Sequence, residues 1–164
     1  MTPHIRHAGP GDWPAIWPIV REVVVAADTF TYDPEMTEAE GRALWMVASP
    51  GRTTVAVDGA ALCGTANMYA NRAGPGAHVA SASFMVASAA RGRGVGRALV
   101  KDALSWAAAA GFSAMQFNAV AATNLAALAL YGSLGFSIVG TVPEAFDHPE
   151  HGLVGLYVMY LRLR

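Results

Sequence analysis

The sequence is poor in cysteine and contains no long apolar run. Its single cysteine, Cys63, cannot form an internal disulfide and lies in an apolar stretch, so we expect it to be a small core residue. No apolar stretch approaches the ~20 residues that a membrane span needs, and residues 1–7 do not open a signal peptide. These absences favour a cytoplasmic protein that has no membrane partner.

The sequence is also poor in charge, because only 14% of its residues are charged whereas 54% are hydrophobic. This composition excludes a disordered chain and predicts a compact fold. A length of 164 residues suits one domain with a substantial core. We therefore expect a single domain over residues 1–164.

Acidic residues are missing from the middle of the chain. None occurs between Asp58 and Asp102, although the net charge of the whole sequence is −1. The basic residues of that interval are Arg72, Arg91, Arg93, Arg97 and Lys101. A locally positive surface of this kind suits a small polyanion. Nucleic acid is not expected as a partner, because the basic residues are few and no aromatic residues alternate with them.

A basic, glycine-rich turn separates an apolar run that ends at Val86 from a segment with helical periodicity. Val95, Leu99 and Trp106 mark the periodic segment, and Gly111 ends it. The glycines of the turn occupy alternate positions: Gly92, Gly94 and Gly96. Glycine has no Cβ to block an approaching anion, and the start of a helix has unpaired N–H groups. The strand, turn and helix therefore predict a phosphate-binding site.

The spacing of the turn distinguishes among the known phosphate-binding loops. In a dinucleotide-binding Rossmann turn the third glycine would fall at Arg97, and no acidic residue lies about 20 residues further on. The Gly-Lys-Ser/Thr of a P-loop is absent as well. The pattern Arg91-x-x-Gly94-x-Gly96 instead resembles the pyrophosphate-binding signature of the GCN5-related N-acetyltransferase (GNAT) superfamily. The alternative is an ordinary glycine-rich turn between a strand and a helix.

A second segment resembles the other cofactor-contacting region of that superfamily. It runs from Asn118 through Asn124, Ala127 and Tyr131 to Leu134-Gly135-Phe136. Asn124, Ala127 and Tyr131 share one face of a predicted helix, since they are three and four residues apart. We expect Thr123 to cap this helix. The alternative is a core helix that buries its leucines, with Tyr131 as a packed aromatic residue.

The resemblance implies the GNAT fold, an α/β architecture with helices on both faces of a mixed sheet of about seven strands. The fourth strand is expected to splay away from the fifth. The hydrophobic patterns predict strands at residues 3–8, 53–57, 62–70, 78–86, 114–118, 136–142 and 153–161. They predict helices from residue 13, from Thr37 to before Pro50, from Val95 to Gly111 and after Thr123 up to Gly135. Residues 143–152 are expected to form a loop.

The resemblance further implies an enzyme that moves an acetyl group from acetyl-CoA to an amine by direct attack. Tyr131 matches the family's general acid, and Asn124 matches the residue that holds the pantetheine or its thioester end. The backbone of Met85 and Val86 would bond the pantetheine arm, which enters the splay, and the amides of residues 91–97 would bind pyrophosphate. The cofactor-binding residues implied are Met85, Val86, Arg91, Gly92, Arg93, Gly94, Val95, Gly96, Arg97, Asn124, Ala127 and Tyr131.

Two groups within the superfamily resemble this sequence in the acceptor region. Residues 29–34 resemble phosphinothricin-type acetyltransferases, and residues 117–143 are similar to fungal acetyltransferases of proline analogues. The implied acceptor is the amine of a small amino-acid-like molecule. The residues implied to contact it are Phe30, Tyr32, Ser81, Asn118 and Phe146. Ser81 stands where relatives carry an asparagine, so its contact with an acceptor carboxylate departs from theirs.

Other interpretations stay open at this point. The acceptor could be a protein N-terminus or a lysine, or the chain could bind an acyl-CoA without catalysis. The apolar alternation of residues 153–161 permits a homodimer, as in many superfamily members. The general base is unassigned among Glu22, Asp28, Glu35, Asp147, His78, His148 and His151. No metal site is expected at residues 147–151, which lack His-Glu-x-x-His spacing.

Overall fold

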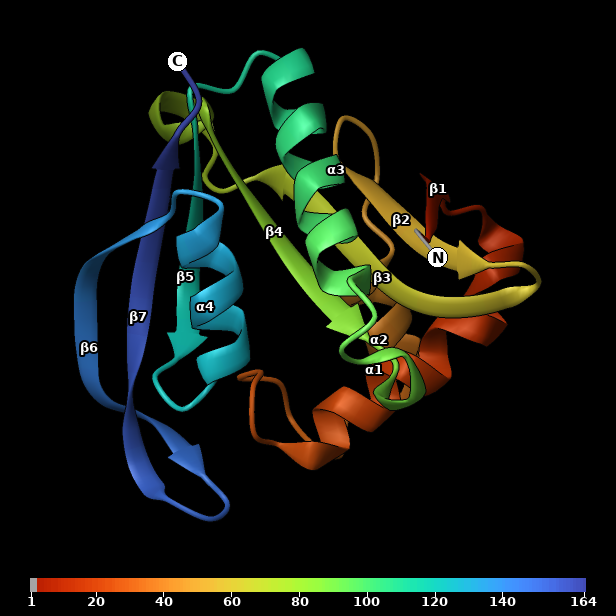
Figure 1. The fold of residues 1–164 in the computed structure, drawn as a ribbon, viewed down its shortest axis with the longest axis horizontal. Coiled ribbons are helices and arrows are strands. Elements are labelled where there is room, and N and C mark those ends of the chain that lie inside the picture. The colour runs from red at the N-terminus through yellow and green to blue at the C-terminus, as the bar shows by residue number, and fades with distance from the viewer. Residues whose placement is uncertain (1–2) are drawn as a thin grey trace.

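The computed structural model describes residues 3–164 and contains one seven-stranded sheet in the order β1-β2-β3-β4-β5-β7-β6 (Figure 1). The strands are β1 (His4–His7), β2 (Arg52–Asp58), β3 (Ala61–Ala70), β4 (Val79–Val86), β5 (Ala114–Ala121), β6 (Ser137–His148) and β7 (Gly152–Arg162). The helices are α1 (Trp13–Ala26), α2 (Glu38–Trp45), α3 (Val95–Ala109) and α4 (Leu125–Ser133). Residues 1–2 lie outside the described residues. They are the start of residues 1–7, which were not expected to open a signal peptide.

The order of helices and strands is the predicted one, and the mixed α/β sheet with helices on both faces is confirmed. Local signals account for several boundaries. Thr37 caps α2, and its capping box is closed by Glu40, whose carboxylate accepts the Thr37 N–H at 2.8 Å. Gly111 follows α3 with a φ of +91°, a conformation that favours glycine. Within residues 3–164, every helix is too short or too polar to span a bilayer.

The predicted loop over residues 143–152 is wrong in its first half. Strand β6 continues through Pro143 to His148, and the turn to β7 is confined to the residues that follow. Proline is tolerated here because β6 is the edge strand of the sheet, where a missing N–H removes no ladder bond on the open side. The register shifts between Val142 and Phe146, and Glu144 in that bulge has a φ of +52°.

Two apolar cores lie on opposite faces of the sheet. On one face Ala56 packs with Leu99 and other residues of α3 and α4, and we call this the α3/α4 face. On the other, Val55 packs with Val20 of α1 and with Trp45 at the end of α2, which defines the α1/α2 face. Neighbouring residues of one strand thus point to opposite cores, as the pleat requires. In Figure 1, α3 crosses in front of β3 and β4, and α1 and α2 lie behind them.

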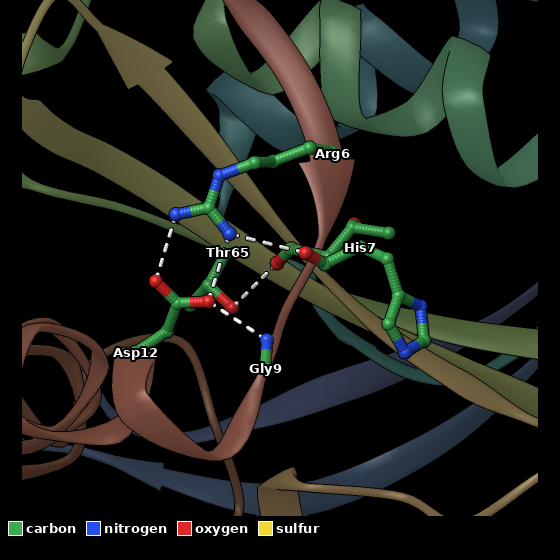
Figure 2. Close-up of polar contacts among 6 residues, drawn as sticks. Arg6, His7, Gly9, Asp12 and Thr65 are labelled. Atoms are coloured by element: carbon green, nitrogen blue, oxygen red, sulfur yellow. Dashed lines mark hydrogen bonds and ion pairs between the residues drawn. The ribbon is translucent and has the colours of Figure 1, made fainter.

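Strand β1 is held to the start of α1 by an ion pair (Figure 2). The Arg6 guanidinium donates to both carboxylate oxygens of Asp12, at 2.8 and 2.7 Å. The N–H of Gly9 donates to the same carboxylate at 2.7 Å. The Arg6 bond, assisted by the Gly9 N–H, lowers the pKa of the Asp12 carboxyl to about 2. This contact closes the turn between the first strand and the first helix.

Strands β4 and β5 run parallel but separate soon after they begin. Their ladder joins Val79 to Ala114 and Ala80 to Met115. Further along, residues 81–86 of β4 pair with β3, and residues 116–121 of β5 pair with β7. Figure 1 shows the two strands diverging from this shared start. The predicted splay between the fourth and fifth strands is therefore present, and it opens the sheet between its two faces.

Candidate active site

The splay forms a cleft of about 900 Å³. Most of its lining comes from the segment after α1, strand β4, the glycine-rich turn with the start of α3, strand β5 and helix α4, and single residues of α1, β3 and β6 complete it. Segments that are distant in the sequence thus meet where β4 leaves the sheet. The volume is within the range of sites that enclose a small molecule or a cofactor arm.

The glycine-rich turn contributes to the lining of this cleft. Gly92 and Gly94 have φ values of +73° and +80°, and Gly94 is the N-cap residue of α3. A side chain at either position would be strained, although no atom lies within 4 Å of where its Cβ would be. The first N–H groups of α3, at Val95, Gly96 and Arg97, have no partner within the helix. The turn and the helix start can therefore bind an anion.

The three arginines of the turn differ in placement. Arg91 and Arg97 line the cleft, whereas Arg93 does not. Arg93 forms an ion pair with Asp58 at 2.6 Å and ties the turn to the β2–β3 hairpin. Arg97 donates to the hydroxyl of Ser133 at 2.8 Å, which connects the start of α3 to the end of α4. Arg91 and Arg97 are thus the cations available to an anion in the cleft, whereas the Arg93 side chain is held by Asp58.

Helix α4 presents the second predicted segment to the cleft. Asn124, not Thr123, is its N-cap: the Ala127 N–H donates to Asn124 Oδ1 at 3.2 Å. This bond fixes the orientation of the Asn124 amide and leaves its NH₂ group to donate elsewhere. Thr123 also lines the cleft, and its hydroxyl is buried without a hydrogen-bond partner among residues 3–164. Asn124, Ala127 and Tyr131 all line the cleft, as their shared helix face predicts.

Tyr131 lies where the two splayed strands part. Its ring centroid is 4.5 Å from that of Phe117 on β5 and 6.2 Å from that of Phe84 on β4. Burial raises the pKa of the Tyr131 phenol above its ordinary value, because the phenolate would lose its hydration. The phenol therefore stays protonated through the neutral and mildly alkaline range. It can donate a hydrogen bond or a proton to an atom in the cleft.

The α1/α2 face of the cleft is aromatic and hydroxyl-rich. Phe30 and Tyr32 stack with centroids 5.3 Å apart and pack against the α1/α2 core. Ser81 and Ser83 of β4 lie on this face, because the pleat alternates them with Ala82, which belongs to the opposite core. Burial raises the pKa of Tyr32, an effect that the Ser83 side chain opposes and Tyr69 reinforces. Tyr69, Ser83 and Tyr32 therefore lie together.

Two other predicted acceptor residues have different placements. Asn118 lines the cleft, and its amide donates to the side-chain oxygen of Asn71 at 2.7 Å. Phe146 is buried against Ala121 and Leu156 and is not part of the cleft lining. Two residues further along β6, His148 does line the cleft. The burial of Phe146 follows from the extension of β6, which makes residue 146 part of the sheet.

The lining also includes polar residues that were not among the predicted contacts, such as Tyr69, Ser83, Thr123 and His148. Ser83 follows Ser81 by two residues, so the alternation of β4 could have identified it. Among the candidate bases, Asp28 and His148 line the cleft, and Glu22, Glu35, Asp147, His78 and His151 are not in its lining. Within residues 3–164, no three side chains of metal-binding type converge.

Comparison with known proteins identifies the family. Residues 17–136 match the model of the Acetyltransferase (GNAT) family, and the chain belongs to that family. It is a family of N-acetyltransferases that use acetyl-CoA as the acetyl donor. The fold, with its parallel β4–β5 pair, is the GNAT fold. The match confirms the prediction, made from the glycine-rich turn and the α4 segment, that the chain belongs to the GNAT superfamily.

Several relatives are similar over most or part of the chain. A GCN5-related N-acetyltransferase from Kribbella flavida is 59% identical, with a TM-score of 0.95 and 98% of each chain covered. A phosphinothricin acetyltransferase from Sinorhizobium meliloti, solved with acetyl-CoA, is 26% identical, with a TM-score of 0.86 and coverage of 99% of this chain and 89% of that one. N-acetyltransferase aca1 of Schizosaccharomyces pombe is 30% identical over 112 residues, which are 67% of this chain and 54% of that protein. The chain thus spans about half the length of this last relative.

Proposed function

We propose that this protein transfers the acetyl group of acetyl-CoA to the amine of a small amino-acid-like molecule. One observation carries the proposal: the anion-binding turn, the α4 face with Asn124 and Tyr131, and a polar aromatic wall line a single cleft through the sheet. The turn and α4 belong to one face, and Phe30 and Tyr32 belong to the other. A donor and an acceptor entering from opposite faces would therefore meet at the splay.

The donor side of the proposal uses backbone groups more than side chains. The N–H groups at the start of α3 would bind the pyrophosphate, with Arg91 and Arg97 near it. From Ser81 to Val86 the side of β4 turned toward the splay has no strand partner among the described residues. Its backbone could bond the amides of the pantetheine arm in the manner of a strand. The free NH₂ of Asn124 could donate to the arm or to the thioester.

The reaction would be a direct acyl transfer. The amine nitrogen forms a bond to the thioester carbonyl carbon, and the carbon–sulfur bond breaks with its electron pair moving to sulfur. Tyr131 donates a hydrogen bond and then its proton to that sulfur. The nitrogen loses a proton as the amide forms, and Asp28, the carboxylate that lines the cleft, can accept it directly or through water.

The size of the cleft supports a small acceptor. A volume of about 900 Å³ is within the range of small-molecule sites and suits the pantetheine arm together with a small acceptor. The similarity to a phosphinothricin acetyltransferase supports an amino-acid-like acceptor. We place the activity in the cytoplasm. A chain with a single cysteine forms no internal disulfide and therefore does not depend on an oxidising compartment.

The proposal includes a homodimer formed along the last two strands. β6 is the edge of the sheet, and its exposed side chains include Ile138, Val139 and Val142. Exposed apolar residues on an edge strand are suited to cover by another chain. Light scattering of the purified protein would test this: a mass of twice 17.1 kDa is expected, and a monomer would contradict it.

The test of the function is release of free thiol from acetyl-CoA in the presence of a panel of amines. The panel contains the proteinogenic amino acids, cyclic proline analogues, simple alkylamines and short peptides with free N-termini. We expect the fastest release with an amino acid or an analogue, and mass spectrometry of the product should show one acetyl group on nitrogen. Faster release with the peptides would favour a protein acceptor. Binding of acetyl-CoA without release would favour a non-catalytic module.

A further inference from the structure

His148 is held in a fixed orientation on the α1/α2 face of the cleft, where we propose that the acceptor binds. It is 9% exposed, although histidine next to a turn is commonly open to solvent. The backbone N–H of Glu150 donates to its Nδ1 at 3.1 Å. Its ring lies 4.6 Å from that of His151 and 6.3 Å from that of Phe146, measured between centroids. The ring therefore has one edge bonded to the backbone and its other edge free.

The free edge belongs to the α1/α2 face of the cleft. Phe146 packs against Ala121, whereas the neighbouring Val120 belongs to the opposite core, so Phe146 lies on the α1/α2 face. His148 lies on the same side of β6 as Phe146, since the two are at positions i and i+2 of the strand. The wall that it joins includes Asp28, Tyr32, Tyr69 and the serines of β4.

The bond to Glu150 determines which nitrogen of His148 carries the proton. An acceptor at Nδ1 needs a lone pair there, and the neutral ring then has its hydrogen on Nε2. Among residues 3–164, no group accepts from Nε2. His148 thus presents one oriented N–H donor. It has no lone pair to offer to the proton of an attacking amine, because Nδ1 is occupied and Nε2 is protonated.

The charges around the cleft make this donor important for acceptor binding. The cationic side chains that line it, Arg91 and Arg97, come from the turn and α3, on the opposite face. On the α1/α2 face the lining contains no arginine or lysine, and its polar side chains besides Asp28 and the His148 imidazole include the hydroxyls of serine, threonine and tyrosine. An oxygen of the acceptor on this face can therefore bond only to neutral donors. The buried, oriented His148 is preorganised to be one of them.

We propose that His148 binds an oxygen of the acceptor, a carboxylate or carbonyl next to the reacting amine, through Nε2–H and does not act as the general base. This inference rests on the proposed function for its substrate. It names a specificity residue: His148 would distinguish an amine that carries a neighbouring oxygen from an amine without one. Because the donors on the α1/α2 face of the cleft are neutral, the amide of an amino acid should bind about as tightly as the free amino acid.

Steady-state kinetics with a matched pair of acceptors tests the proposal. The probes are L-leucine and 3-methylbutylamine, which differ by the carboxylate alone. We expect His148→Phe to raise KM for L-leucine about tenfold, which is the effect of one hydrogen bond. For the alkylamine, both kcat and KM should stay within twofold of the values for the unmodified enzyme. His148→Gln keeps an N–H near the position of Nε2 and should restore KM to within about threefold. His151→Phe removes an exposed neighbouring imidazole and serves as the control.

Three kinetic outcomes would overturn the inference. These are a KM for L-leucine that His148→Phe leaves unchanged, an equal rise for both amines, or a fall in kcat of a hundredfold or more that His148→Gln does not restore. The last result would identify a base. Lack of any transfer by the unmodified enzyme to these or other amines would count against the proposed function and not against His148.

A measurement independent of activity tests the orientation itself. In protein labelled with ¹⁵N-histidine, the His148 signals are identified by their loss in His148→Gln. At pH 8 we expect Nε2 to have the shift of a protonated nitrogen and Nδ1 that of an unprotonated one. Finding the proton on Nδ1 would overturn the inference, whether or not an acceptor is known.

Discussion

The ring of Phe117 lies 4.5 Å from the ring of Tyr131, and this contact fixes the phenol at the point where β4 and β5 separate. Phe117 is 5% exposed and comes from β5, whereas Tyr131 comes from α4. The same packing removes water from the phenol and raises its pKa above the ordinary value. The fold thus holds a protonated donor at the splay.

Tyr131→Phe should lower kcat by about 100-fold or more, because general acid catalysis contributes factors of this size. Binding of acetyl-CoA should change less than about threefold, since the ring and its packing are retained. Stopped-flow or steady-state thiol release together with calorimetric titration would measure both quantities.

Tyr160→Phe is the matched control for this change, because Tyr160 lies on β7 and is not part of the cleft lining. An unchanged kcat in Tyr131→Phe would remove Tyr131 from the role of acid. A loss of acetyl-CoA binding in the same variant would instead indicate a binding role.

Gly64→Ala should destabilise the protein by about 1–3 kcal/mol, as overpacking does in a close-packed core. A Cβ at residue 64 would lie 2.9 Å from the Met85 carbonyl oxygen and 2.9 Å from Val95 Cγ1 at the start of α3. Because α3 would have to move, the glycine-rich turn should move with it and acetyl-CoA affinity should fall. Chemical denaturation measures the first effect.

Gly132→Ala is the comparison, since it lies in α4 and no atom is within 4 Å of the added Cβ. It should be neutral or stabilising by up to about 1 kcal/mol through helix propensity. Equal stability of the two variants would show that β3 and α3 are less closely packed than described.

Asp12→Asn should cost about 1 kcal/mol near neutral pH, a modest figure because Arg6 is partly exposed and the pair is screened by solvent. The pKa of Asp12 is lowered to about 2, so its contribution is complete above the unfolded value of about 3.9 and is lost as the pH falls toward 2. The difference between the two proteins should therefore shrink between pH 4 and pH 2 in denaturation curves.

Asp33→Asn is the control variant. It also removes a carboxylate that accepts a backbone N–H, that of Glu35. A difference between Asp12→Asn and the unmodified protein that stays constant down to pH 2 would contradict the role of the ion pair.

The donor half of the proposed site could be described from the sequence because its determinants are local. The glycine turn is specified by residues 91–96 and by the helix that follows them. The face of α4 is specified by the spacing of Asn124, Ala127 and Tyr131. Patterns of this kind need no knowledge of which strand pairs with which.

The acceptor half of the proposed site depends on tertiary structure, and the sequence described its lining less completely. Pro143 is a signal for a loop, but the position of β6 at the sheet edge overrides it, and this brings His148 to the cleft while it buries Phe146. Tyr69 joins the wall from β3, which no local pattern links to the loop after α1. Thr123 and Asn124 are both good caps by residue type, and only the backbone geometry selects Asn124.

Calorimetric titration of acetyl-CoA into the unmodified protein, Gly94→Glu and Gly74→Glu tests the central claim most directly. Both glycines have positive φ and open space at Cβ, so the two variants share backbone strain and added charge, but only Gly94 lines the cleft. The account predicts saturable binding by the unmodified protein and by Gly74→Glu, and its loss in Gly94→Glu. Binding that Gly94→Glu retains unchanged, or its absence in the unmodified protein, would contradict the cleft as the acetyl-CoA site.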